Sequence, residues 1–302
     1  MKKFSLKLFL IAIALFVVDW VTGSVLERMY FNQTKSDYGF TTKALDIQTS
    51  DIVILGSSRA QRHYNPSIIS DSLSSLTVYN AGRNGHFLVY QTAVLKMMLD
   101  RYTPNVVMLD LTPYDLADNN GDTDYDKLSS LLPYSNHMSY DEILRMRSWY
   151  EPIKAISKTY RYNSTFFKLL HPGSSDYQDN GYEPLYGSLQ GANKLKETIN
   201  DTYPLSDKKI RELKRMIELC DDNKIKFVVL TSPYYANYPE TPTMKYVAAL
   251  AKEKGFVYHS WMNTKQYDNP ELYHTPDHLN AEGADIFSRE VVSYLMSKLN
   301  CK

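Results

Sequence analysis

The stretch Asp51-Ile-Val-Ile-Leu-Gly-Ser-Ser-Arg-Ala60 decides the fold. Its four apolar residues, Ile52–Leu55, run directly into Gly56-Ser57-Ser58, a pattern that predicts a buried strand ending in a tight turn. Ligands of open α/β sheets bind at the carboxyl ends of the strands. We therefore expect Ser58 at the mouth of a ligand site, although such a turn is also compatible with a plain turn or a helix cap.

Short apolar strands alternate with helical patterns along the rest of the chain. The predicted strands cover residues 51–55, 76–80, 105–111, 225–231 and 256–259, and the predicted helices cover about 87–101, 207–222, 242–254 and the segment from about 281. Strands that alternate with helices form a parallel sheet covered on both faces. The sequence therefore predicts an α/β domain of three layers with a flavodoxin-like parallel sheet.

Helix-end signals support two of these helices. Ser206 is a candidate N-cap for the helix at 207–222. Thr241-Pro242 provides a cap followed by a first-turn proline for the helix at 242–254, and Gly255 provides its end.

Two segments do not follow the alternation. Residues 28–50 are polar and mixed, and we expect a juxtamembrane connector that precedes the domain at 51–302. Residues 116–205 are rich in Tyr, Asn, Asp and Ser. We expect this stretch to be an insertion that caps the strand ends, or alternatively a separate small domain.

The amino-terminal residues 1–27 predict a signal anchor. Lysines 2, 3 and 7 precede the apolar run Leu8–Val18, and apolar residues continue past Asp19 to Leu26. Counted to Leu26, the segment is long enough for a transmembrane helix, which needs roughly 20 residues. The lysines predict a cytoplasmic amino terminus and a domain outside the cytoplasmic membrane. The alternatives are a buried helix or a cleaved signal, with a cleavage site at residues 21–23, that leaves a secreted or periplasmic protein.

Composition excludes several function classes. Basic and acidic residues number 34 each, so there is no positive excess for a nucleic-acid partner. The sequence has no HExxH, paired CxxC or GxGxxG motif, and we expect neither a metal nor another cofactor. The 25 tyrosines suit a surface that binds sugars or lipid headgroups, or they pack at a partly hydrated surface without binding a ligand.

A serine nucleophile needs a base and donors for the oxyanion. His278, in the loop before the last predicted helix, is the preferred base for Ser58. His274 and His86 are weaker candidates, and His63 is expected to have a structural role.

Asn80-Ala81-Gly82-Arg83-Asn84-Gly85 lies between the second predicted strand and its helix. Two glycines allow the backbone to approach a ligand closely, and N–H groups at a helix start favour negative charge. We expect the N–H groups of Ser58 and Gly85 to bind the oxyanion. The alternative for this segment is a tight strand-to-helix connection.

These segments resemble the SGNH/GDSL hydrolase superfamily over residues 51–112 and 225–299. Gly56-Ser57-Ser58-Arg59 is similar to the block that carries the nucleophile, and residues 80–85 are similar to the block whose glycine binds the oxyanion. Asp277-His278-Leu279-Asn280 is similar to the block that carries the catalytic histidine. The resemblance implies esterase chemistry, and the anchored form is similar to bacterial envelope members that act on acylated polysaccharides or other cell-surface polymers.

Two positions depart from the family pattern. Tyr114 occupies the place of an oxyanion asparagine, and Thr275 occupies the place of the triad aspartate. Asp277 is the remaining candidate acid, but neighbouring side chains in an extended loop point apart. The sequence therefore predicts a Ser–His dyad in which Thr275 or a backbone carbonyl holds the imidazole of His278.

The expected function is an extracytoplasmic serine esterase that acts on an acylated polysaccharide or another envelope ester, for example by deacetylation. Alternatives are an O-acyltransferase that uses the same acyl-enzyme, a non-catalytic binding or scaffold protein of the same fold, and a phosphate-binding module. The expected partners are that substrate and, through the amino-terminal helix, the cytoplasmic membrane.

Overall fold

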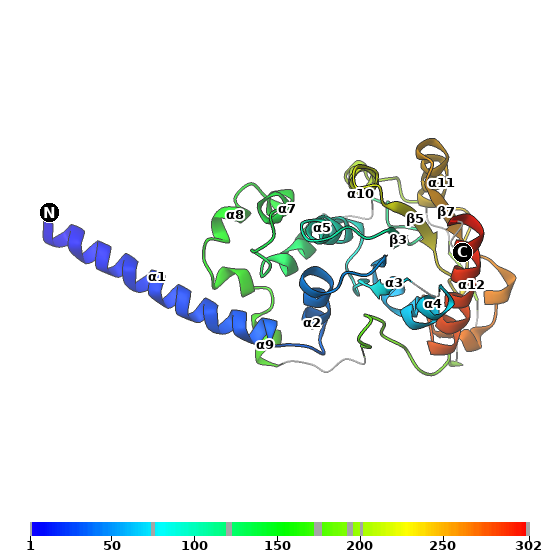
Figure 1. Ribbon diagram of the computed structural model, residues 1–302, viewed down its shortest axis with the longest axis horizontal. Helices are drawn as coiled ribbons and strands as arrows, with labels where there is room; N and C mark the ends of the chain where they lie inside the picture. The colour runs from blue at the N-terminus through cyan, green and yellow to red at the C-terminus, as the bar shows by residue number, and fades with distance from the viewer. Residues whose placement is uncertain are drawn as a thin grey trace.

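A computed structural model describes residues 2–73, 76–118, 123–171, 177–191, 196–199 and 202–299. Its centre is a five-stranded parallel sheet with the strand order β2-β1-β3-β5-β7 (Figure 1). The strands are β1 (Ile52–Gly56), β2 (Val78–Asn80), β3 (Val106–Asp110), β5 (Lys226–Thr231) and β7 (Val257–Ser260). Each of the five predicted strands is present, and the predicted α/β fold is confirmed.

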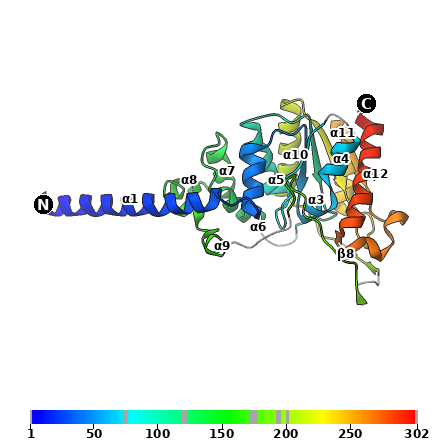
Figure 2. The same ribbon diagram turned by 60° about the horizontal axis from the view of Figure 1, so that its bottom comes forward.

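Helices cover both faces of this sheet. One face packs against α5 (Leu88–Leu99), α10 (Asp207–Asp222) and α11 (Pro242–Lys254), and the other packs against α3 (Ser58–His63), α4 (Pro66–Ser72) and α12 (Ala281–Leu299) (Figure 2). Successive residues of β1 alternate between the two cores, because side chains of a strand point to opposite faces. Two small sheets complete the fold, β4 (Glu197–Thr198) with β6 (Ala236–Asn237), and β8 (Tyr273–Thr275) with β9 (His278–Leu279).

The predicted helix boundaries agree closely with the structure. α10 and α11 have the predicted ends. The Thr241 side chain accepts a hydrogen bond from the Met244 N–H at 3.3 Å, and Gly255 ends α11 with φ +80°. Ser206 is at the N-cap position of α10, but its side chain makes no capping hydrogen bond.

The segment predicted as a connector, residues 28–50, is folded at residues 37–47. This segment forms α2 (Asp37–Thr42) and a π-helical turn, η1 (Lys43–Ile47), which packs against α5. Its apolar side chains Phe40 and Leu45 are buried. Because each helical piece is only five or six residues long, neither repeats its apolar residues often enough to show a helical period.

Around residues 137–139 the insertion lies at the sheet edge opposite the carboxyl ends of the strands, where the predicted cap would lie. His137 Nδ1 lies 3.0 Å from the Met97 carbonyl oxygen, and the Ser139 N–H donates to Asp100 at 2.8 Å. Both partners lie at the carboxyl end of α5, which returns the chain to the amino ends of the strands. The segment contains α6 (Thr123–Asp126), η2 (Lys127–Leu131), α7 (Tyr140–Arg147), α8 (Glu151–Lys154), η3 (Tyr160–Tyr162) and α9 (Phe166–Leu170).

Residues 177–191 of the insertion follow a different path, beside β2, α3 and the start of α12. The Asn80 N–H donates to the Asn180 carbonyl at 2.9 Å, and the Ala281 N–H donates to the Leu185 carbonyl at 2.7 Å. The remaining insertion residues, 119–122, 172–176, 192–195 and 200–201, lie outside the described residues.

The amino-terminal helix α1 (Lys2–Phe31) projects from the domain on the side opposite α12 (Figures 1 and 2). Among the described residues it is the one helix whose length and apolar composition suffice to cross a membrane.

Candidate active site

The turn from β1 into α3 places Ser58 at the carboxyl edge of the sheet. Gly56 has φ +143°, and a Cβ at this position would lie 2.7 Å from both the Ala60 Cβ and the Asp110 carbonyl oxygen. Only glycine fits such a conformation and such a close approach. Ser57 is the N-cap of α3, and Ser58 is the first residue of the helix.

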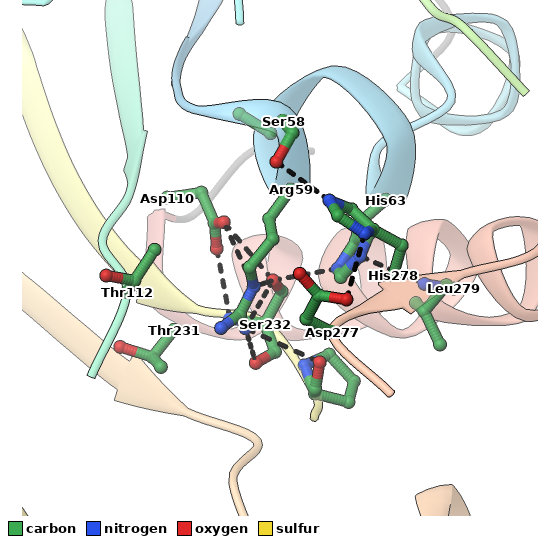
Figure 3. Close-up of polar contacts among 12 residues, drawn as sticks. Ser58, Arg59, His63, Asp110, Thr112, Thr231, Ser232, Asp277, His278 and Leu279 are labelled. Carbon is green, nitrogen blue, oxygen red and sulfur yellow. Dashed lines mark hydrogen bonds and ion pairs between the residues drawn. The ribbon is translucent and has the colours of Figure 1, made fainter. Parts of the chain in front are cut away.

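His278 reaches Ser58 from the other end of the chain. Its Nε2 lies 2.8 Å from the Ser58 Oγ (Figure 3). The histidine begins β9, which pairs antiparallel with β8, and Thr275 is its partner across the turn. The sheet thus brings together the two side chains that the sequence predicts to be in contact.

Two side chains hold the other nitrogen of the imidazole. His278 Nδ1 lies 2.9 Å from the Thr275 Oγ1 and 3.1 Å from the Asp277 Oδ1. The Thr275 hydroxyl in turn donates to Asp277 at 2.6 Å. With Nε2 accepting from Ser58, Nδ1 carries the proton and donates to this pair.

The expectation that Asp277 points away from its neighbour was therefore wrong. Residues alternate sides only in extended backbone. Asp277 instead lies in the turn between β8 and β9, where a bulge shifts the register between Tyr273 and Thr275. The carboxylate consequently turns back toward the ring of His278.

Asp277 is held in its ionised form. Burial alone would raise its pKa, but the hydrogen bond and charge interaction with His278, together with the Thr275 hydroxyl, hold the pKa well below its usual range. The Asp277 carboxylate is therefore available as an acceptor for the Nδ1 proton of His278.

The loop after β2 offers an unused donor. Gly85 has φ +67°, a Cβ there would meet nothing within 4 Å, and its N–H has no hydrogen-bond partner among the described residues. The Arg83 N–H donates to the Gly56 carbonyl at 3.0 Å, and the Asn84 N–H donates to the Gln61 Oε1 at 2.7 Å. These bonds fix the loop against the turn that carries Ser58.

Tyr114 lies in the turn that follows β3 and is partly buried. Its hydroxyl is hydrogen-bonded to Tyr234, and the Arg59 guanidinium lies nearby. The Tyr234 ring stacks on that guanidinium, 5.0 Å from its centre. Burial raises the pKa of Tyr114, so its hydroxyl keeps its proton.

A buried polar cluster beneath Ser58 and His278 was not predicted from the sequence. Arg59 donates to the Ser232 hydroxyl at 3.1 Å and lies 3.9 Å from Asp110 (Figure 3). His63 Nδ1 lies 2.9 Å from the same Ser232 hydroxyl. Asp110 ends β3 and Ser232 follows β5, so a sequence signal existed in polar residues at the ends of apolar runs.

His63 connects this cluster to the strand that carries His278. The Leu279 N–H donates to the His63 Nε2 at 3.0 Å. Burial, followed by the charge of Arg59, holds the pKa of His63 well below its usual range. The ring is therefore neutral, accepting at Nε2 and donating at Nδ1, as its two partners require. The structural role predicted for His63 is consistent with these contacts.

The other candidate bases have other partners. His274 Nδ1 lies 2.7 Å from the Tyr186 carbonyl, and His86 Nδ1 lies 2.7 Å from the Asn84 carbonyl. Among the described residues, the histidine hydrogen-bonded to Ser58 is His278 and neither of these two. Over the same residues, no group of three or more His, Cys, Asp or Glu side chains could hold a metal ion.

The sequence matches no family model and no curated protein. Similarity to known proteins is found among solved structures. A solved structure from Desulfitobacterium hafniense DCB-2, described as a member of the G-D-S-L family of lipolytic proteins, is similar over 80% of this chain and 98% of its own, with 12% sequence identity and a TM-score of 0.40.

Proposed function

We propose that this protein is a serine-dependent esterase. The supporting observation is the 2.8 Å contact between His278 Nε2 and the Ser58 Oγ, with Nδ1 held by Thr275 and Asp277. A serine hydroxyl becomes a useful nucleophile only when a positioned base takes its proton. A scaffold protein has no need for an imidazole oriented on both sides in this way.

In the proposed reaction, His278 takes the proton of Ser58 as the Oγ attacks the carbonyl carbon of an ester. The N–H groups of Ser58 and Gly85 stabilise the negative oxygen of the tetrahedral intermediate. The imidazolium then gives its proton to the departing alkoxide, which leaves an acyl-serine. Water, deprotonated by His278, attacks that ester, releases the carboxylic acid and restores the hydroxyl of Ser58.

We assign the third oxyanion donor to Tyr114. When Tyr234 donates to the Tyr114 oxygen, the Tyr114 proton remains free to donate to a ligand. Removing one oxyanion donor typically raises the barrier by roughly 3–4 kcal/mol. Tyr114→Phe should therefore lower kcat strongly.

The proposed substrate is an acylated envelope polysaccharide, and the proposed reaction is removal of its acyl groups outside the cytoplasmic membrane. This assignment is supported by α1, by the lysines at its amino end and by the aromatic residues beside the site. Tyr186 is exposed, and its carbonyl contacts His274 in the strand that leads to Thr275. Exposed aromatic rings with polar tips suit binding to sugar rings.

A fluorophosphonate probe, which reacts with activated serines, tests the esterase assignment on the detergent-solubilised full chain. Labelling should be lost in Ser58→Ala and strongly reduced in His278→Ala. Ser57→Ala and His274→Ala are matched controls that should keep normal labelling. A folded wild-type protein that does not react, or a Ser58→Ala variant that still reacts, would show that the proposal is wrong.

The substrate is tested separately. Purified protein should release acetate from acetylated envelope polysaccharide, and Ser58→Ala should release none. Mass spectrometry of Ser58 trapped during turnover would identify the acyl group. If the protein hydrolyses a small phenyl ester but releases no acetate from the polysaccharide, the esterase assignment stands and the proposed substrate is wrong.

A further inference from the structure

Asp19 lies within the apolar sequence of α1, yet its carboxylate has several partners in the folded domain. It accepts hydrogen bonds from the Ser157 hydroxyl at 2.6 Å, the Lys158 N–H at 2.8 Å and the Thr159 N–H at 3.2 Å. The Thr159 hydroxyl also donates to the Asp19 carbonyl at 3.0 Å. A loop of the insertion is therefore bound directly to the middle of the helix.

Lys158 extends this contact along α1. Its Nζ lies 2.7 Å from the Glu27 carboxylate and 3.0 Å from the Ser24 hydroxyl. A Cβ at Gly23 would lie 2.6 Å from the Lys158 side chain. One face of α1, from Asp19 to Glu27, is thus docked on the domain.

The opposite face of the same helix turns stays exposed and apolar. Val21 and Val25 are 50% and 56% exposed. The apolar run before the docked region, Leu8–Val18, rises only about 17 Å, whereas a bilayer core is about 30 Å thick. Counted to Val25, the rise is about 27 Å, which is close to the thickness of the core. A bilayer that surrounds α1 must therefore reach the level of the 157–159 loop.

Large apolar side chains are exposed on both sides of that loop. Trp149 is 72% exposed, Ile156 is 75% exposed and Phe167 is 77% exposed. Exposed apolar patches of this kind mark interaction surfaces. α8, which lies between Trp149 and Ile156 in the sequence, and α9, which carries Phe167, lie on the side from which α1 projects (Figures 1 and 2). We call this set the membrane face; it consists of Trp149, Tyr150, Ile153, Ile156, Phe166, Phe167 and Leu170.

We infer that the membrane face inserts into the bilayer beside α1, so that the domain is seated in the lipid surface rather than suspended above it. Tryptophan and tyrosine favour the membrane–water interface, and basic side chains extend from it toward water. Lys168 lies between Phe167 and Leu169 and can do so. The hydrogen bonds of the 157–159 loop explain how Asp19 is accommodated at membrane depth, because its charge is fully hydrogen-bonded.

Depth-dependent fluorescence quenching tests the inference on the full chain. Trp20→Phe leaves two tryptophans, Trp149 and the buried Trp261. This variant is reconstituted into phosphatidylcholine vesicles whose acyl chains are brominated near the headgroup. The bromolipid should quench most of the Trp149 emission, and Trp149→Phe in the same background should remove the quenched component.

A matched control places a tryptophan on the far side of the molecule. Met296 is exposed on α12, away from α1. In the Trp20→Phe, Trp149→Phe background, Met296→Trp should show no quenching. Equal quenching at positions 149 and 296, or none at position 149, would overturn the inference. Failure of the protein to float with the vesicles would overturn it as well. Fluorophosphonate labelling of Ser58 reports the esterase proposal separately.

Discussion

Thr275 and Asp277 both contact Nδ1 of His278, but a neutral hydroxyl and a charged carboxylate affect the ring differently. The Thr275 hydroxyl is neutral, so it can orient the ring but adds no charge to stabilise it. Asp277 is an anion 3.1 Å from Nδ1 and also accepts from Thr275. The carboxylate is therefore expected to stabilise the imidazolium that forms during proton transfer, while Thr275 fixes its geometry.

Asp277→Asn keeps the size of the side chain and removes its charge. We expect kcat for ester hydrolysis to fall roughly 10²-fold with little change in KM, because the charge acts on the transition state. Steady-state kinetics check this result. Asp268→Asn, a surface carboxylate paired with Lys196, is the control and should retain wild-type kcat. An unchanged kcat in Asp277→Asn would show that the Asp277 charge is not needed and that Thr275 alone supports the His278 ring.

His63 predicts a pH dependence of stability. Because its pKa is depressed in the folded protein, the unfolded chain binds a proton below about pH 6.5 and the folded protein does not. Stability should therefore fall with decreasing pH by up to about 1.4 kcal/mol per pH unit at this residue. The Tm of His63→Gln should drop less than that of the wild type between pH 7 and pH 5.5. His274→Gln, at an exposed histidine, should match the wild type.

The pairing of Ser58 with His278 could be predicted because each follows a strong local signal, an apolar run and a loop before a helix. The cluster of Arg59, His63 and Ser232 could not be assigned in the same way. Its members come from two elements, and their contacts depend on how α3 packs over β5. The orientation of the Asp277 side chain was predicted wrongly for a local reason. The alternation of residues along a strand does not reveal the register shift between Tyr273 and Thr275 or the turn that follows it.

At the scale of elements, the start of α12 holds the loop of His278 in place. The Asn280 Oδ1 accepts from the Gly283 N–H at 2.9 Å and so caps the helix. Its amide donates to the Glu271 carbonyl at 2.7 Å and to the Gly187 carbonyl at 3.0 Å. One side chain therefore joins α12, the segment before β8 and the end of the insertion.

Asn280→Ala should cost about 1–3 kcal/mol of folding free energy, since it removes a helix cap and two buried hydrogen bonds to backbone carbonyls. It should also slow fluorophosphonate labelling, because the loop of His278 loses its attachment. Urea unfolding and labelling rates measure the two effects. Asn65→Ala, which removes the cap of α4, is the control and should destabilise the protein without slowing the labelling. Equal slowing in both variants would contradict the assignment.

The sheet and the helices α10, α11 and α12 could be predicted from their sequences. Each element buries one or both faces against a neighbouring layer, so its apolar residues recur with the spacing of a strand or a helix. Residues 37–47 and 123–171 could not be placed because long-range contacts fix their positions. Tyr30 of α1, for example, lies 3.1 Å from Tyr134 of the insertion, oxygen to oxygen. The spacing of apolar residues in these segments does not predict such a contact.

At the scale of the whole molecule, α1 and the insertion form a single unit. Tyr30 packs at the centre of a group of rings that includes Tyr38, Tyr134 and Tyr162. The helix is thus joined to the domain through packed rings and through Asp19 rather than by a flexible connector.

Because α1 is packed firmly on the domain, we predict that it anchors the whole protein in the membrane. Expressed with all its residues, the protein should remain with the membrane fraction after a carbonate wash. Detergent should release it, because the apolar residues from Phe4 to Val18 are exposed in the structure. Immunoblotting of pellet and supernatant measures the distribution. Recovery in the carbonate supernatant would contradict the anchor.

The sequence separation of 220 between Ser58 and His278 has a consequence for biosynthesis. A ribosome completes the serine early and supplies its base only when the polypeptide is almost finished. If the domain crosses the membrane as it is synthesised, the segment that carries Ser58 crosses before the one that carries His278, and the serine hydroxyl is not activated during that passage. Esterase activity would then begin only after the last helix folds, so fragments from stalled or truncated synthesis would be harmless to esters inside the cell.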